Sequence, residues 1–331
     1  MSFPFNVYAL ALVSSGLTTA LAFPLARRLC LRSGLVDAPG RRKIHDQPTP
    51  LAGGLAVLAG LCVPLLAGAL VLTLRPLGLP AEALDAVTGK LMTHGLDRRA
   101  VQLGGLILGA LGMFLLGWVD DRHELGAGAK FAGQCVVAAF VAAAGVRITL
   151  FVPSLLFSYA VTILWILTVT NALNFMDNMN GLCAGLGAIA AWHFAMIASG
   201  SGQYLVAVFA LTACGALLGF LPYNFPRAKA FLGDSGSHLV GYLLAVLAIL
   251  PHFYTKTHAH RWAVVTPLLV LAVPLFDLAW VVVLRWRLGK PVYVGDTNHL
   301  SHRLARRGWR QSTVVLTIWL VAALAGALGC R

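Results

Sequence analysis

The chain has 331 residues, of which 59% are hydrophobic and 11% are charged, and its mean hydropathy is +0.80. A soluble globular protein carries about 25% charged residues, so this composition excludes a soluble domain and predicts an all-α, polytopic membrane protein. The formal net charge of +13 does not indicate a nucleic-acid partner, because the basic residues flank apolar runs and are better explained by attraction to membrane lipid headgroups.

A transmembrane helix needs about 20 consecutive apolar residues. We predict about ten such helices in a single integral membrane domain covering residues 1–331. Their ranges are 5–26, 51–74, 101–118, 131–144, 152–171, 181–198, 204–221, 236–250, 262–284 and 312–330.

The distribution of charge predicts the orientation of these spans. Of the 25 lysines and arginines, 17 lie in or beside the loops that follow the first, third, seventh and ninth spans. We predict that the protein lies in the cell inner (plasma) membrane. The positive-inside rule places these loops in the cytoplasm and both termini on the opposite side of the membrane. Eight of the twelve acidic residues lie on the same side. We therefore expect the active site at the cytoplasmic face.

The first of these loops contains a compact basic cluster between prolines, formed by Arg41, Arg42, Lys43 and His45. Such a cluster can bind a phosphate or a nucleotide. A cluster that only sets membrane topology has the same composition, and from this loop alone the topological explanation is favoured.

Three acidic residues, Asp120, Asp121 and Glu124, lie where the third span is predicted to leave the membrane, and Lys130 follows them. Neighbouring carboxylates repel one another and are costly to desolvate, so a cation is expected near them. A divalent metal, Lys130 or both can supply this charge. The alternative is a solvated loop between two spans.

Polar residues recur at every third position from the last residue of the fifth predicted span, at Asn171, Asn174, Asp177 and Asn180. Residues three apart share a face of a helix, so these side chains are expected to form one inward stripe. Polar groups at a membrane edge are costly unless they are partnered. We favour a functional site over contacts that only hold helices together.

Glycines surround Asp234 in the Gly-Asp-Ser-Gly tetrad at 233–236, and Phe231 lies three residues earlier. The glycines would let a bulky anion or a metal approach the carboxylate closely. A serine-hydrolase nucleophile needs a strand-turn-helix context that this sequence does not predict, so we reject that interpretation. Phe231 could stack on a nucleotide base or pack as an ordinary apolar residue.

The last predicted cytoplasmic loop is the most basic, and His299, His302 and Arg303 lie close together in it. Two histidines three residues apart can bind a metal. The many acids and amides elsewhere indicate magnesium, for which histidine is a poor ligand. Phosphate binding is therefore the better hypothesis for this cluster.

Taken together, six stretches resemble the polyprenyl-phosphate N-acetylhexosamine-1-phosphate transferases, which form glycosyltransferase family 4 and include undecaprenyl-phosphate GlcNAc-1-phosphate transferases. The stretches follow one another over nearly the whole chain and read RRKIHDQPTPLAGG, GWVDDRHELGAGAKFAGQ, NALNFMDNMNGLCAG, FLGDSGSHLVGY, PLFD and DTNHLSHRL. One of them alone would be weak evidence. Six in order on one predicted membrane face are strong evidence.

The resemblance implies a reaction, a cofactor and partners. N-acetylhexosamine-1-phosphate, in particular GlcNAc-1-phosphate, would pass from a UDP-sugar to polyprenyl (undecaprenyl) phosphate with release of UMP, the first membrane step of cell-envelope glycan or polysaccharide biosynthesis. The cofactor would be Mg2+, with Mn2+ as a substitute. The partners would be UDP-N-acetylhexosamine, polyprenyl phosphate and membrane lipid, and a homodimer is compatible with this class.

The resemblance also assigns roles to individual residues. It implies catalytic roles for Asp120, Asp121, Lys130 and Asp177, and metal ligation by Asn174 and Asp234. It implies a uracil pocket formed by Asn180 and Phe231. The remaining substrate-binding residues that it implies are Lys43, His45, His299, His302 and Arg303.

The chain departs from the family pattern at three points. Glu124 ends an acidic box that usually ends in aspartate. The bacterial Asp-Gly-x-Asp-Gly pattern reads Asp-Asn-Met-Asn-Gly at 177–181, which loses one acid. The His-x-His-His pattern reads His-Leu-Ser-His at 299–302, with Ser301 in place of the middle histidine. These departures bear on activity and on the range of sugars.

Three alternatives stay open at this point. A UDP-MurNAc-pentapeptide phosphotransferase would apply the same chemistry to another donor, although the first loop and the HLSHRL ending favour the GlcNAc type. A secondary transporter also places polar residues within a multi-span bundle, but here the acids gather at one face and no inverted repeat is visible. A non-catalytic relative would bind nucleotide sugar or lipid without transfer.

Overall fold

The computed structural model describes residues 4–37, 48–74, 86–149, 152–251, 265–291, 293 and 297–330, and these segments are almost entirely helical. The longer helices are α1 (Phe5–Ser33), α2 (Gly53–Leu74), α3 (Ala86–His123), α4 (Ala127–Ala143), α5 (Leu155–Met176), α6 (Leu182–Gly200), α7 (Tyr204–Asn224), α8 (Gly233–Leu247), α10 (Ala272–Arg287) and α12 (Gln311–Gly329). The short elements are α9 (Thr266–Val270), α11 (Leu300–Arg306) and the antiparallel pair β1 (Val36–Asp37) and β2 (Thr49–Pro50).

The prediction of an all-α polytopic membrane protein is confirmed, whereas the count of ten spans is not. Within the described residues, seven helices are long and apolar enough to cross a membrane: α1, α2, α3, α5, α6, α7 and α12. Helices α4 and α8 fall at two further predicted spans, but they have only 17 and 15 residues.

The ninth predicted span, 262–284, is broken in the described part of its range. Helix α9 ends before Leu271, and α10 begins directly after it. Pro274 lies in the first turn of α10 and has no backbone N–H to donate to the carbonyl of Val270, so a continuous helix through this point loses a hydrogen bond. A hydropathy count does not register this break, because proline interrupts the helix without adding charge.

Helix α8 forms the centre of the bundle and packs against α2, α3, α5 and α6. From Ser235 to Leu247 every side chain position of α8 is buried. Glycine makes the closest of these contacts possible, because a Cβ at Gly117 of α3 would overlap the backbone of Asp234 and Ser235. This approach brings the carboxylates at the end of α3 against the beginning of α8.

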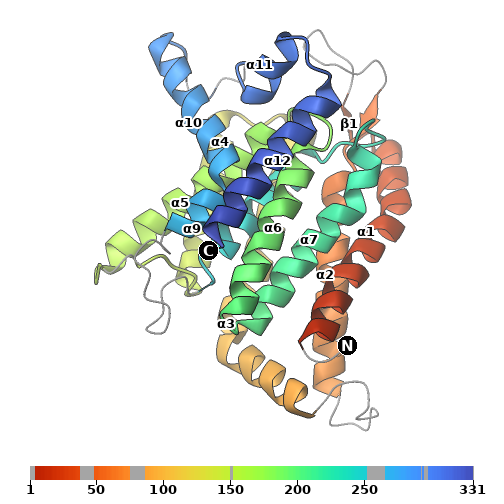
Figure 1. Cartoon of the computed structure of the whole chain (residues 1–331), viewed down its shortest axis with the longest axis vertical. Coiled ribbons are helices and arrows are strands. Elements are labelled where there is room, and N and C mark those ends of the chain that lie inside the picture. The colour runs from red at the N-terminus through yellow and green to blue at the C-terminus, as the bar shows by residue number, and fades with distance from the viewer. Residues whose placement is uncertain are drawn as a thin grey trace.

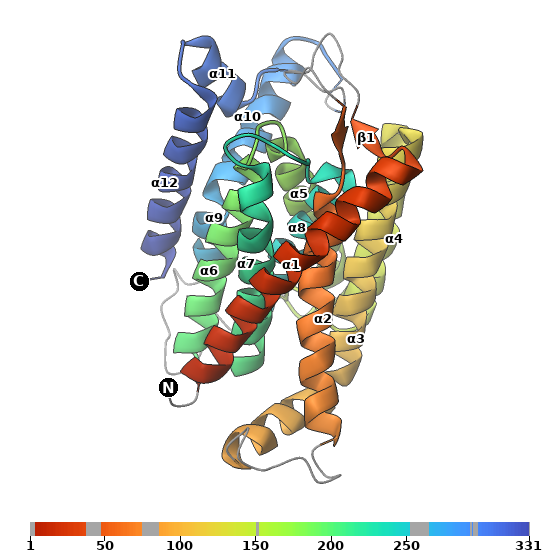
Figure 2. The same cartoon turned by 90° about the vertical axis from the view of Figure 1, so that its right-hand side faces the viewer.

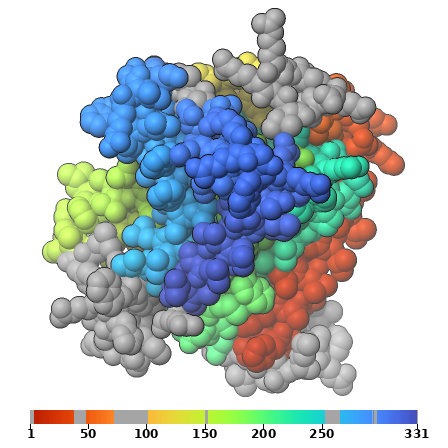
Figure 3. Space-filling model, turned by 45° about the horizontal axis from the view of Figure 1, so that its top comes forward, coloured from red at the N-terminus to blue at the C-terminus, as the bar shows by residue number. Residues whose placement is uncertain are grey.

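The predicted cytoplasmic loops meet at one end of the bundle. Helix α11 and strand β1 mark this end in Figures 1 and 2, and both termini lie away from it. Figure 3 looks towards the same end, where α10, α11 and α12 cover one side and α1 and α7 lie on the other. The ends of α3, α5 and α7 and the beginning of α8 lie between them.

Candidate active site

A cleft of about 2350 Å³ opens at this end of the bundle. It is lined by residues from α1, the ends of α3, α5 and α7, the beginning of α8, and the chain between α10 and α12. The predicted site residues that line it are Asp120, Asp121, Asn174, Asp177, Asn180, Phe231, Asp234 and His302. Four segments far apart in the sequence thus contribute to one polar surface.

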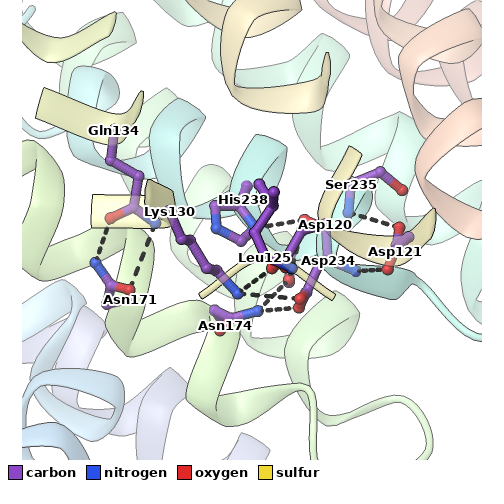
Figure 4. Close-up of polar contacts among 11 residues, drawn as sticks. Asp120, Asp121, Leu125, Lys130, Gln134, Asn171, Asn174, Asp234, Ser235 and His238 are labelled. Atoms are coloured by element: carbon purple, nitrogen blue, oxygen red, sulfur yellow. Dashed lines mark hydrogen bonds and ion pairs between the residues drawn. The ribbon is translucent and has the colours of Figure 1, made fainter. Parts of the chain in front are cut away.

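A cation bridges two of the carboxylates in this cleft. The Nζ atom of Lys130 lies 2.7 Å from Oδ2 of Asp120 and 3.0 Å from Oδ2 of Asp234 (Figure 4). The second oxygen of Asp120 accepts a hydrogen bond of 2.8 Å from the backbone N–H of Leu125. Lys130 thus supplies positive charge at the place where neighbouring carboxylates require it.

Asp121 directly follows Asp120 in the chain, but its carboxylate contacts the backbone of α8 and not Lys130. Its two carboxylate oxygens accept hydrogen bonds from the backbone N–H groups of Asp234, at 2.7 Å, and Ser235, at 3.0 Å. These N–H groups belong to the first turn of α8, where the helix itself offers no acceptor. Asp121 therefore caps α8 from another helix and fixes where the Asp234 side chain stands.

Asp234 remains accessible within this network. Its side chain is 34% exposed, and its second oxygen accepts a hydrogen bond from Nδ2 of Asn174, which also donates to Oγ of Ser237 at 2.9 Å. The Nδ1 atom of His238 lies 2.6 Å from the backbone oxygen of Asp234 and must be the donor, since a carbonyl only accepts. Helices α4, α5 and α8 thus hold one carboxylate that faces the cleft.

The predicted helical stripe extends only to Asn174, because α5 ends at Met176 and Asp177 is its C-cap residue. Asn171 exchanges hydrogen bonds with Gln134 of α4, at 2.7 and 3.4 Å, so it joins two helices. Asn174 and Asp177 line the cleft. Burial raises the pKa of the Asp177 carboxyl to about 8, and the negative charges of Asp234 and Asp121 act in the same direction. The surroundings of Asp177 therefore favour the protonated form of its carboxyl.

Asn180 and Phe231 line the cleft on the side of the loop between α7 and α8. The side chain of Asn180 donates a hydrogen bond of 3.3 Å to the carbonyl of Pro226. The backbone of Phe231 bonds to Pro50 and Gly53, each at 3.0 Å, which ties this loop to the beginning of α2. The two residues predicted to bind uracil thus share one cleft.

The predicted basic cluster in the last loop does not converge on the cleft. His302 lines it, but His299 is 5% exposed and its Nδ1 atom lies 2.6 Å from Oδ2 of Asp277. The guanidinium of Arg303 lies 4.8 Å from the ring centroid of Trp280, beside a separate pocket of about 220 Å³ between α10 and α11. Lys43 and His45 lie outside the described residues.

The oxygen donors in the cleft fit a hard divalent cation. Asp234, Asp177 and Asn174 offer carboxylate and amide oxygens, which are the ligands that Mg2+ takes in proteins. Within the described residues, no group of three or more histidine, cysteine, aspartate or glutamate side chains is arranged to hold a metal by itself. The donor set thus suits an ion that keeps water or substrate oxygens among its ligands.

Sequence patterns did not single out several residues that support the site. Asn224 accepts a hydrogen bond from Gly181 at 2.7 Å and donates to Ala230 at 3.0 Å, which holds the turn before α6 against the next loop. Arg285 is 1% exposed and lines the cleft, with its guanidinium 5.2 Å from the ring centroid of Phe175. The sequence signal that could have identified Arg285 is its position directly after the apolar run of the ninth predicted span.

The fold and this cleft define a multi-pass membrane protein with a large polar cleft at one end of its helix bundle. Residues 103–252 match the family model described as glycosyl transferase family 4. The chain belongs to this family, that of the polyprenyl-phosphate N-acetylhexosamine-1-phosphate transferases, and the resemblance stated from its motifs is confirmed.

Relatives with curated names match over most of their length. The probable undecaprenyl-phosphate N-acetylglucosaminyl 1-phosphate transferase of Bacillus subtilis is 32% identical, over 94% of this chain and 81% of the relative. The decaprenyl-phosphate N-acetylglucosaminephosphotransferase of Mycobacterium tuberculosis is 35% identical, over 96% and 80%. The undecaprenyl-phosphate alpha-N-acetylglucosaminyl 1-phosphate transferase of Escherichia coli is 28% identical, over 96% and 82%.

Proposed function

We propose that this protein transfers GlcNAc-1-phosphate from UDP-GlcNAc to polyprenyl phosphate and releases UMP, as the first membrane step of a cell-envelope glycan. The observation that carries the proposal is the contact of Lys130 with Asp120 and Asp234, two carboxylates that line the cleft of a membrane bundle. Family membership supports the same chemistry, and the named relatives are transferases of N-acetylglucosamine phosphate.

The reaction exchanges one phosphoanhydride bond for another. An oxygen of the lipid phosphate attacks the phosphorus that bears the sugar, the bond to the uridine-bearing phosphate breaks, and UMP leaves with the electron pair. Asp120 is only 7% exposed and its oxygens are held by Lys130 and the Leu125 N–H. This arrangement favours direct attack by the lipid phosphate over a covalent intermediate on Asp120, whose role becomes placing Lys130.

Magnesium is the proposed cofactor, with manganese as a substitute. Asp234, Asn174 and Asp177 are the residues that would hold it, since they bring oxygen donors to the cleft. When bound, the ion would neutralise part of the charge of the donor diphosphate. Lys130 supplies a second, fixed positive charge on the protein side of the same carboxylates.

The cleft is proposed to face the cytoplasm across the inner (plasma) membrane. Seventeen of the 25 lysines and arginines lie in or beside the loops assigned to this side, which supports that orientation. UDP-sugars are cytoplasmic nucleotides, and the lipid phosphate lies at the headgroup level. Both substrates can therefore reach a cleft at the end of the bundle without crossing the membrane.

The test is transfer from a panel of UDP-sugars to polyprenyl phosphate by the purified, detergent-solubilised protein. UMP release and a lipid-linked product are expected with UDP-GlcNAc and Mg2+, and neither is expected after chelation. Product only with UDP-MurNAc-pentapeptide would replace the proposed donor. Movement of a solute across proteoliposomes without UMP release would replace the enzyme by a transporter.

A further inference from the structure

Helix α11 is too short to hold its own position. It has only seven residues, and an isolated helix of this length is unstable in water. Asp277 of α10 fixes one side of its first turn, because its oxygens contact Nδ1 of His299 and the backbone N–H of Leu300, each at 2.6 Å. The carboxylate is 1% exposed, so this contact is sheltered from water.

A second contact holds the same turn from the side of the cleft. The hydroxyl of Ser301 donates a hydrogen bond of 2.7 Å to Oδ1 of Asn178, and Nδ2 of Asn178 donates to the carbonyl of Phe175 at 2.6 Å. Ser301 is fully buried, whereas Asn178 lines the cleft. The bond therefore joins α11 directly to the turn that follows α5.

We infer that Ser301 and Asn178 form a positioning pair that sets His302 relative to the turn at 177–181 and thereby sets the affinity for the UDP-sugar. Asn178 stands between Asp177 and Asn180, and Ser301 directly precedes His302. All three of these flanking residues line the cleft. The inference rests on the proposed function for the identity of the ligand, and it assigns no chemical step to either residue.

The two positions have a further connection in the sequence. Asn178 lies in the stretch 177–181 and Ser301 lies in the stretch 299–302, and these are two of the stretches at which this chain departs from the family pattern described above. The structure brings the two stretches into direct contact.

Ser301→Ala tests the pair by removing the donor. We expect the Kd for UDP-GlcNAc, measured by calorimetry, to rise about tenfold, because the acceptor on Asn178 loses its partner and α11 loses its bond to the turn at 177–181. The KM for polyprenyl phosphate should change less than about twofold, and kcat less than about threefold. A merely destabilised protein would instead lose active fraction and lower kcat with both affinities unchanged.

The matched control is Ser312→Ala, which removes the same hydroxyl from the second residue of α12. It should leave the Kd unchanged. In an Asn178→Ala background, Ser301→Ala should add less than about twofold to the Kd, since the shared bond is already lost. Hydrogen exchange should show the amides of 300–306 exchanging about tenfold faster in Ser301→Ala than in the wild type.

These readouts separate the inference from the proposed function. A wild type that binds UDP-GlcNAc but gives no transfer would overturn the function and leave the positioning pair supported if Ser301→Ala still weakens binding. Additive effects of Ser301→Ala and Asn178→Ala would overturn the pair. An unchanged Kd and unchanged amide exchange in Ser301→Ala would overturn it as well, even with full transfer activity.

Discussion

Asp120 and Asp121 are adjacent residues whose carboxylates contact different parts of the molecule. Asp120 contacts the ammonium of Lys130, and Asp121 contacts the backbone of α8. An asparagine at position 121 keeps one acceptor but turns an amide N–H2 towards a backbone N–H. Loss of the Asp120 carboxylate would therefore remove the ion pair with Lys130, whereas loss of the Asp121 carboxylate would remove the cap of α8. Their adjacent positions in the sequence do not show this difference.

Asp120→Asn and Asp121→Asn are both expected to lower the transfer rate by about 100-fold, as loss of a principal electrostatic group does. Only Asp121→Asn should also lower the apparent melting temperature, because it loses a helix cap that is worth about 1 kcal/mol. Transfer assays and thermal unfolding in detergent measure the two effects. Equal melting temperatures for the two variants would contradict the capping role of Asp121.

The raised pKa of Asp177 predicts a pH-dependent stability. The folded protein holds this proton up to about pH 8, whereas the ordinary value is 3.8. The folded state therefore binds the proton more tightly, and the stability that this proton provides is present below about pH 4 and lost as the pH rises to about 8.

Asp177→Asn should remove this dependence. Without divalent metal at pH 8, we expect the variant to melt about 2–4 °C above the wild type, and the difference should vanish near pH 4. Melting curves in chelator at the two pH values measure it. A larger difference at pH 4 than at pH 8 would show that the carboxyl is not held in its neutral form.

The sequence predicted the types and spacing of the site residues better than their contacts. The three-residue spacing predicted that Asn174 and Asp177 lie together, and both line the cleft, although α5 ends between them at Met176. It could not show that Asn171 pairs with Gln134, because that contact depends on where α4 docks. Arg303 stands beside Trp280 for the same reason, since packing against α10 fixes the rotation of α11.

At the scale of elements, the approach of α3 to α8 decides whether the site can form. Gly117 lies one turn before the carboxylates, and a methyl group there would overlap the backbone of Asp234 and Ser235. The hydrophobic pattern predicted a helix at each of these places, but not that they touch. Packing between helices that are far apart in the sequence leaves no local pattern in the sequence, apart from small residues such as this glycine.

Gly117→Ala should separate α3 from α8 and lower the transfer rate at least tenfold, together with the melting temperature, as overpacking in a close contact does. Gly104→Ala is the matched control on the same helix, because a Cβ at Gly104 meets no described atom within 4 Å. Transfer rate and thermal unfolding should be unchanged in the control. Full activity in Gly117→Ala would mean that the two helices can separate without affecting the site.

At the scale of the whole molecule, the asymmetry of charge predicts the orientation in the membrane. Cys330 is exposed near the end of α12, away from the cleft, while the exposed Glu124 lines the cleft. A membrane-impermeant maleimide should label Cys330 in intact cells and should label a Glu124→Cys variant at that position only after permeabilisation. Cys330→Ser should abolish the outside signal. Labelling with the opposite sidedness would reverse the proposed topology.

The bond between Asp121 and the first turn of α8 also has a consequence for biogenesis. It joins residues 113 positions apart, so α3 enters the membrane long before its partner has been synthesised. Helix α8 has 15 residues, fewer than the roughly 20 that span a bilayer, and it begins with polar groups at Asp234, Ser235, Ser237 and His238. Such a segment is a poor substrate for insertion on its own. We therefore expect α8 to enter the bilayer together with helices that have already been inserted, so that the candidate active site forms in one late step of assembly.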